Sequence, residues 1–182
     1  MKIACEYSHL GGSEILQVRY PEINAEIYDV IAEINAERTK VSKEKTMKGK
    51  LLFSPRDLNK AFSDSFQSRG YEKLRDYFEI PICDNDRKVR AYKEIDFSKD
   101  RVLVEVQFGK YAFMFYDMAK FQYFFNERKA DVGVEIVPCY NLQREMSSGV
   151  SYGEQLVNDI ERLRRHFPAV PIKVILVDVN SD

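Results

Sequence analysis

The chain has 182 residues, of which 45% are hydrophobic and 13% aromatic, with only 8 glycines and 6 prolines. This length and composition predict one folded domain over residues 1–182, and they argue against two full domains and against an intrinsically disordered chain. The formal net charge of -1 gives no overall sign of a nucleic-acid partner.

The charges are nevertheless unevenly distributed. Residues 1–37 carry seven acidic and two basic side chains, whereas residues 38–60 carry eight basic and two acidic ones. Such a basic cluster can meet a phosphate backbone while the whole protein stays near neutral. On charge alone, a solvated surface loop explains the cluster equally well.

The cysteines and the apolar stretches point to a cytoplasmic protein. Cys5, Cys83 and Cys139 lie far apart, and with two histidines they form no zinc motif, so we expect reduced thiols. The first residues lack the apolar run of a signal peptide, and no stretch approaches the length of a membrane span. The sequence therefore predicts a soluble protein with no membrane partner.

The first elements in chain order are short. Residues 3–7 are predicted to form a strand, with a hairpin partner at 16–18. Pro21 then opens a helix, because the isoleucines and valine that follow it form one apolar stripe.

The next segments are more polar. The basic stretch 38–50 is predicted to be a loop, and a helix begins at Ser54, a good capping residue with an acidic residue three positions later. That helix is expected to stop at Gly70. Residues 71–77 are predicted to be helical, and residues 81–88 are turn-rich.

In the second half of the chain, segments with the sequence pattern of strands alternate with segments that have the pattern of helices. Residues 101–108 (RVLVEVQF) have the period-two pattern of a strand, and residues 110–128 read as a buried aromatic helix. A strand at 132–137, a helix at 154–166 and a strand at 170–179 follow. This order predicts an α/β fold with a central mixed or parallel β-sheet flanked by helices.

Three polar residues stand where chemistry is expected. Glu105 and Gln107 lie two apart on the strand and so project from the same face, and a turn in the polar segment after Asp96 would bring Asp96 beside Glu105. Two carboxylates at a sheet end suit Mg²⁺, and an amide can orient a water molecule or hold a phosphate oxygen. Ordinary polar residues on a solvent-facing strand are the plainer alternative. Apolar helices on both sides of the sheet weaken that alternative, because a covered carboxylate needs a partner.

Several motifs together resemble one enzyme family. They are YSHLGG near residue 7, SKEKT at 42–46, SP at 54–55, DFSKDRVLVEVQFGKY at 96–111, DVGVEI at 131–136 and EMSSGVSY at 145–152. In this order and spacing the chain resembles the BglII/BstYI group of type II restriction endonucleases, within the PD-(D/E)xK nuclease superfamily. The segment 71–94 resembles nothing in that group.

The resemblance implies a site-specific deoxyribonuclease that acts as a homodimer on double-stranded DNA. It implies Mg²⁺-dependent hydrolysis that leaves 5′ overhangs, at a palindromic six-base-pair site with a GATC core. Asp96 and Glu105 would bind the metal. Gln107 stands where the superfamily usually has a lysine, and this group shares the glutamine, so the resemblance leaves open how water is activated.

The same resemblance implies which residues contact DNA. Lys110, Ser147 and Ser148 would read bases, and the basic stretch with Lys43 and Lys45 would position the backbone. Without the resemblance, Lys110 is an ordinary residue at a helix start, and the serines are turn or capping residues.

Three rival functions remain open at this point. The first is a repair or junction-resolving nuclease of the same superfamily, and the second is a DNA-binding protein that has lost catalysis. The third is an α/β domain unconnected with DNA, which predicts no salt-dependent DNA binding.

Overall fold

A mixed six-stranded sheet forms the centre of the protein. The computed structural model describes residues 1–83 and 87–180. The three strands with the longest apolar runs lie in the middle and pair in parallel, as expected for strands covered on both faces. The outer strands pair antiparallel. In spatial order the strands are β1 (Lys2–His9), β8 (Ile172–Asp178), β7 (Val132–Pro138), β6 (Val102–Val106), β5 (Lys88–Lys99) and β4 (Glu72–Pro81).

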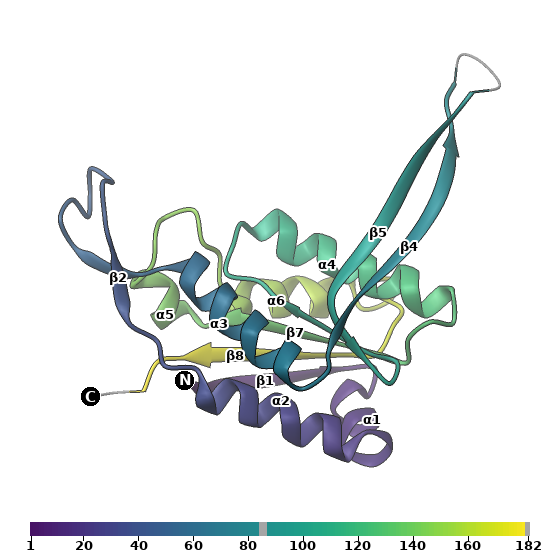
Figure 1. The fold of residues 1–182 in the computed structure, drawn as a ribbon, viewed down its shortest axis with the longest axis horizontal. Helices are drawn as coiled ribbons and strands as arrows, with labels where there is room; N and C mark the ends of the chain where they lie inside the picture. Colours follow the sequence, from purple (N-terminus) through teal and green to yellow (C-terminus); the bar gives the residue numbers. More distant parts are fainter. Residues whose placement is uncertain (84–86, 181–182) are drawn as a thin grey trace.

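Helices cover both faces of this sheet (Figure 1). On one face, Gly12 lies so close to the backbone of Ile172 that a Cβ would overlap it. On the other, Gly133 leaves the space that the ring of Phe121 fills. No helix within the described ranges is long and apolar enough to cross a bilayer. The helices are α1 (Gly12–Arg19), α2 (Pro21–Glu33), α3 (Pro55–Ser68), α4 (Tyr111–Asn126), α5 (Tyr140–Arg144) and α6 (Gly153–Leu163).

Most predicted elements of the second half are confirmed, and two of the first half are wrong. Residues 16–18 belong to α1, whose Leu16 is fully buried, and β1 pairs instead with β8 at the far end of the chain. Residues 71–77 enter strand β4, because their alternating exposure fits pairing with β5 and not a helix. The predicted loop 38–50 is in part a hairpin, with strands β2 (Arg38–Val41) and β3 (Leu51–Phe53).

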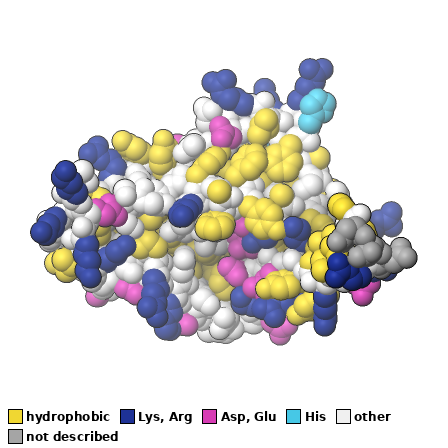
Figure 2. All heavy atoms as spheres, turned by 90° about the horizontal axis from the view of Figure 1, so that it is seen from above, with side chains coloured by type: hydrophobic (Ala, Val, Ile, Leu, Met, Phe, Trp, Pro, Cys, Tyr) yellow, Lys and Arg dark blue, Asp and Glu magenta, His cyan; other side chains and the backbone are white. Residues whose placement is uncertain are grey.

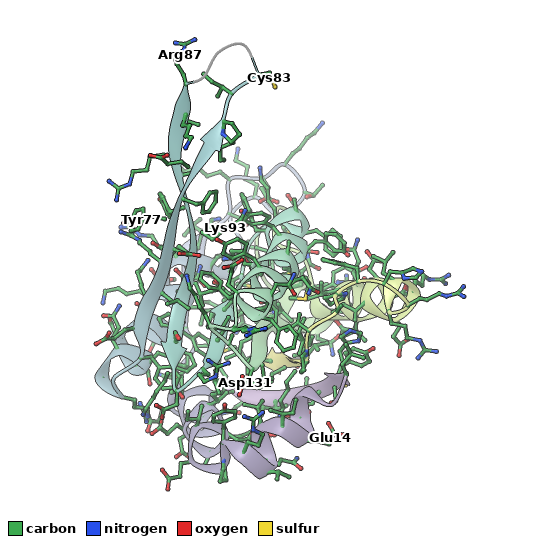
Figure 3. The ribbon with its side chains drawn as sticks, turned by 90° about the vertical axis from the view of Figure 1, so that its right-hand side faces the viewer. Glu14, Tyr77, Cys83, Arg87, Lys93 and Asp131 are labelled. Carbon is green, nitrogen blue, oxygen red and sulfur yellow. The ribbon has the colours of Figure 1, made fainter. Side chains whose placement is uncertain are left out.

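Two hairpins project from the body on the same side (Figure 1). One is formed by β2 and β3, and the other by the outer halves of β4 and β5. The second is stiffened by an aromatic pair, Tyr77 and Tyr92, whose ring centroids lie 5.7 Å apart. Figure 3 shows it rising from the sheet, with Cys83 and Arg87 near its far end. Asp96 lies near the end of β5 at the base of this hairpin, so the hairpin begins next to the predicted metal site.

Candidate active site

Asp96 and Glu105 come together as the sequence predicts. Strands β5 and β6 pair antiparallel with Phe97 opposite Val104, so Asp96 falls opposite Glu105 one residue further along. The tight turn between the strands places Asp100 and Arg101 at positive φ. The backbone N–H of Asp96 donates to Oε1 of Glu105 at 3.3 Å. Cross-strand neighbours share a face of the sheet, so both carboxylates project the same way.

The next strand adds a third carboxylate. Glu135 of β7 lies beside Glu105 in the parallel register, so the two also share that face. Its side chain is fully buried, and neither carboxylate oxygen has a hydrogen-bond partner in the described part of the chain. A buried carboxylate without a partner is costly, which makes Glu135 an unusual feature of this sheet.

Helix α4 closes the cluster from above the sheet. Lys120 Nζ lies 2.5 Å from Oε1 of Glu105 and 2.7 Å from Oδ1 of Asp117. Nε2 of Gln107 donates to Oδ2 of Asp117 at 3.3 Å. Glu105 and Asp117 each expose only 3% of their side chains, whereas Asp96 exposes 46%. Asp96 therefore faces solvent, and the other groups lie behind it.

Burial dominates the electrostatics of this cluster. Burial, then the charge of Asp117, raises the pKa of Glu105 to about 8, while Lys120 opposes the rise. Burial likewise raises the pKa of Asp117, and it raises that of Glu135 well above its ordinary value. For Lys120, burial lowers the pKa, but Glu105 and Asp117 outweigh it and keep the lysine charged. The cluster thus holds more carboxylates than cations, which suits a site for a further cation.

Gln107 is held in place by its surroundings. Its backbone N–H donates to the carbonyl of Ile136 at 2.9 Å, just past the end of β6. Oε1 of Gln107 lies where a Cβ on Gly109 would come within 2.4 Å. The glycine of the Phe-Gly-Lys motif therefore leaves room for the amide of Gln107, which contacts Asp117.

The residues present fit a divalent cation that is held mainly from one side. No three acidic, histidine or cysteine side chains converge on one point in the described ranges. Mg²⁺ is commonly held by only one or two carboxylates, with water and phosphate oxygens completing its shell. Asp96 borders an open cavity of about 220 Å³, so such oxygens have room to reach it. The cavity is lined by Asn59, Ser63, Lys73, Asp96, Phe97 and Val106.

The residues predicted to contact DNA gather beside one another. Lys40 Nζ donates to Oγ of Ser147 at 3.1 Å, and the backbone N–H of Ser148 donates to the carboxylate of Glu44. The turn between β2 and β3 thereby touches the 147–148 loop. They border a groove of about 700 Å³, and its lining includes Lys45, Lys48, Lys50, Arg144 and Ser148.

The remaining two DNA-contact predictions lie nearby. Lys43 is exposed on the same β2–β3 turn, and Lys110 is exposed at the start of α4. The 147–150 loop is tied to this helix start, because the N–H of Ser151 donates to the carbonyl of Gly109. Figure 2 shows Lys and Arg side chains gathered at the end of the molecule where β2 and β3 lie.

Sequence reasoning missed three residues of the cluster, namely Asp117, Lys120 and Glu135. Each left a signal, because each is a charge in an otherwise apolar element. Asp117 lies on the same face of α4 as the buried Phe121 and Phe124. Glu135 interrupts the apolar run of β7. A charge on a buried face indicates a paired or functional group.

Glu135→Gln is expected to stabilise the metal-free protein, by about 1–3 kcal/mol at neutral pH. The folded-state pKa of Glu135 is raised, so the unfolded chain loses this proton first and the wild type loses stability as pH rises above about 4.5. The gain from the substitution should therefore be small at pH 4 and grow towards pH 8. Urea unfolding at several pH values measures it. The exposed Glu72→Gln is the control, and a gain independent of pH would show that Glu135 is not held protonated.

Comparisons with known proteins identify the family and the fold of the chain. The family model described as restriction endonuclease BglII/BglIII matches residues 4–177. The crystal structure of restriction endonuclease BglII complexed with a DNA 16-mer superposes with a TM-score of 0.79 and 23% identity, covering 99% of this chain and 79% of that one. Free BglII superposes with a TM-score of 0.71 and 22% identity, covering 100% and 82%. No curated protein sequence matches the chain.

Proposed function

Because the chain belongs to the BglII/BglIII family and is a type II restriction endonuclease, we propose that it cuts a palindromic six-base-pair DNA site with a GATC core, using Mg²⁺. One observation carries the choice of site: Asp96 and Glu105 meet across β5 and β6 and share a face of the sheet. Two carboxylate ligands suit Mg²⁺, and the open cavity that Asp96 borders has room for a phosphate group.

The catalytic roles divide among three side chains. Asp96 and Glu105 are proposed to hold the metal, which when bound polarises the scissile phosphate and lowers the pKa of a bound water. Gln107 carries no charge, and its Nε2 is already committed to Asp117. Its Oε1 is therefore the atom left to accept a hydrogen bond from the attacking water.

The DNA is proposed to lie between the two projecting hairpins. Both rise on the same side of the body (Figure 1). Asp96 lies near the end of β5, at the base of one of them. Lys43 and Lys45 of the other hairpin would neutralise the backbone phosphates. Lys110, Ser147 and Ser148 would reach base edges, since a lysine can donate to guanine O6 and N7 in the major groove.

Residues 1–182 are proposed to act as one endonuclease domain in a homodimer. A palindromic site presents the same half-site twice, so two identical subunits related by a twofold axis can each read one half. Helix α4 offers a surface for the second copy, because Phe113 and Tyr116 are 55% and 45% exposed. Sedimentation equilibrium would show a species of twice the chain mass.

Digestion of a sequenced plasmid tests the function directly. With Mg²⁺ we expect discrete fragments whose ends carry four-base 5′ overhangs at GATC-centred sites, and with EDTA we expect intact DNA. Cutting that depends on branched or damaged structure would favour a repair or junction-resolving nuclease. Tight binding without any cleavage would favour an inactive DNA-binding protein.

Lys110→Ala is expected to weaken binding to the cognate site by about 1–3 kcal/mol while leaving nonspecific binding nearly unchanged. Lys110 is exposed at the start of α4 and has a flexible stem, so its removal disturbs no packing. Titration of cognate and scrambled duplexes at one salt concentration measures both affinities. Arg162→Ala on α6 is the control, and equal losses on both duplexes would make Lys110 a phosphate contact only.

A further inference from the structure

Lys120 is a charged side chain in an apolar helix. It lies on α4, with Met118 and Phe121 as buried neighbours, and only 14% of its side chain is exposed. Immobilising a lysine costs rotamer entropy, and burying its charge costs more. Two ion pairs, to Glu105 and to Asp117, offset that cost. The arrangement therefore depends on the two carboxylates that it contacts.

The two carboxylate oxygens of Glu105 differ in their contacts. Oε1 accepts from Lys120 Nζ at 2.5 Å and from the backbone N–H of Asp96 at 3.3 Å. The hydrogen bonds and the ion pair that the described residues make to the Glu105 carboxylate all fall on Oε1 and none on Oε2. One oxygen is thus fixed by the protein, and the other remains for a ligand.

A chain of contacts holds Lys120 itself in place. Asp117 lies one turn earlier on α4 and binds Lys120 through Oδ1, while its Oδ2 accepts from Gln107. The network therefore runs without a break from Gln107 through Asp117 and Lys120 to Glu105. A residue supported by packed helix and strand backbones keeps its geometry better than one on a loop.

We infer that Lys120 is the positioning residue for the metal-binding carboxylate of Glu105. This inference rests on the proposed metal site. Lys120 acts through Glu105 and does not touch the substrate. It would fix the orientation of the carboxylate and leave Oε2 available to a cation, as outer partners of metal ligands commonly do.

The test compares Lys120→Met with Lys120→Arg. Mn²⁺ is titrated into each protein by calorimetry, with and without duplex DNA, and the Mn²⁺ concentration for half-maximal cleavage is measured in parallel. We expect Lys120→Met to weaken Mn²⁺ binding by about 10–100-fold, and Lys120→Arg to restore most of it, because it keeps the charge. Lys129→Met, which removes the α4-flanking lysine paired with Asp76 outside the cluster, should bind Mn²⁺ like the wild type.

A folding defect is handled by a paired variant. Lys120→Met alone leaves Asp117 buried without its cation, whereas Lys120→Met with Asp117→Asn removes both charges together. Circular dichroism identifies the folded proteins. If the folded variant binds Mn²⁺ as well as or more tightly than the wild type, the inference is overturned. If the wild type neither binds Mn²⁺ nor cuts DNA with it, the metal site is overturned and this inference with it.

Discussion

Asp96→Asn is expected to lower the rate of DNA cleavage roughly 10³-fold or more, while DNA binding and folding stay close to those of the wild type. A loss of this size corresponds to about 4 kcal/mol of transition-state stabilisation, a reasonable share for one of two anionic metal ligands. Asparagine keeps the shape and one oxygen but removes the charge. Because 46% of the Asp96 side chain is exposed, the substitution leaves no buried group unpaired.

The control for Asp96→Asn is a substitution of Glu94, which contacts the same lysine as Asp96. Lys73 Nζ contacts both Glu94, at 2.8 Å, and Asp96, at 3.4 Å. Glu94 lies on β5, as Asp96 does, so Glu94→Gln disturbs the same lysine without changing a contact of Glu105. Single-turnover cleavage of a plasmid, with binding followed by fluorescence anisotropy, separates the two effects. Retained cleavage by Asp96→Asn would remove Asp96 from the mechanism, and an equal loss in Glu94→Gln would assign the effect to Lys73.

The fold was predictable where local pattern and final environment agree. The strand at 102–106 follows from its period of two, and the helix at 111–126 from its run of aromatic and other apolar residues, most of which pack against the core. The segment 71–77 was mispredicted because strand β4 lies at the sheet edge, where it has one partner strand and no buried apolar face to mark it as a strand. What makes it a strand is its pairing with β5, which is a non-local contact.

In the candidate site, too, contacts between residues close in the sequence were predictable and long-range contacts were not. Asp96 and Glu105 lie nine residues apart in one hairpin, so a single turn brings them together. Asp117 and Lys120 reach the same point only because α4 crosses back over the sheet. That crossing depends on the βαβ connection from β6 to β7 and on Phe121 filling the space at Gly133. Sequence separation hides such partners, although their charge on a buried face marks them.

The two proposed metal ligands differ in burial, and this difference would give them different roles. Asp96 is half exposed and lies at the rim of the 220 Å³ cavity, where a phosphate group can approach. Glu105 is buried, and its Oε1 is held by Lys120. In the proposed site, Glu105 would thus be fixed before any substrate arrives, and Asp96 would complete the metal site from the side where DNA is proposed to lie. Fixing one ligand in advance lowers the entropy that binding would otherwise cost.

Glu105→Gln is expected to abolish Mg²⁺-dependent cleavage, again by roughly 10³-fold or more, and to weaken Mn²⁺ binding in the same experiment. The fold should survive, because the Oε1 of glutamine can still accept from Lys120 and from the N–H of Asp96. Lys120 also keeps its 2.7 Å ion pair with Asp117. The substitution thus removes the charge of one ligand and leaves the packing around it intact.

To decide the role of Glu105, the cleavage rate and the thermal stability are measured on the same preparation of each protein. A folded Glu105→Gln protein that binds duplex DNA but no longer cuts it supports a metal ligand. Glu135→Gln, one strand away on the same face, is the matched control, because it removes a buried carboxylate that is not a proposed ligand. Cleavage by Glu105→Gln within about tenfold of the wild type, a change of about 1.4 kcal/mol, would reduce Glu105 to a structural partner of Lys120.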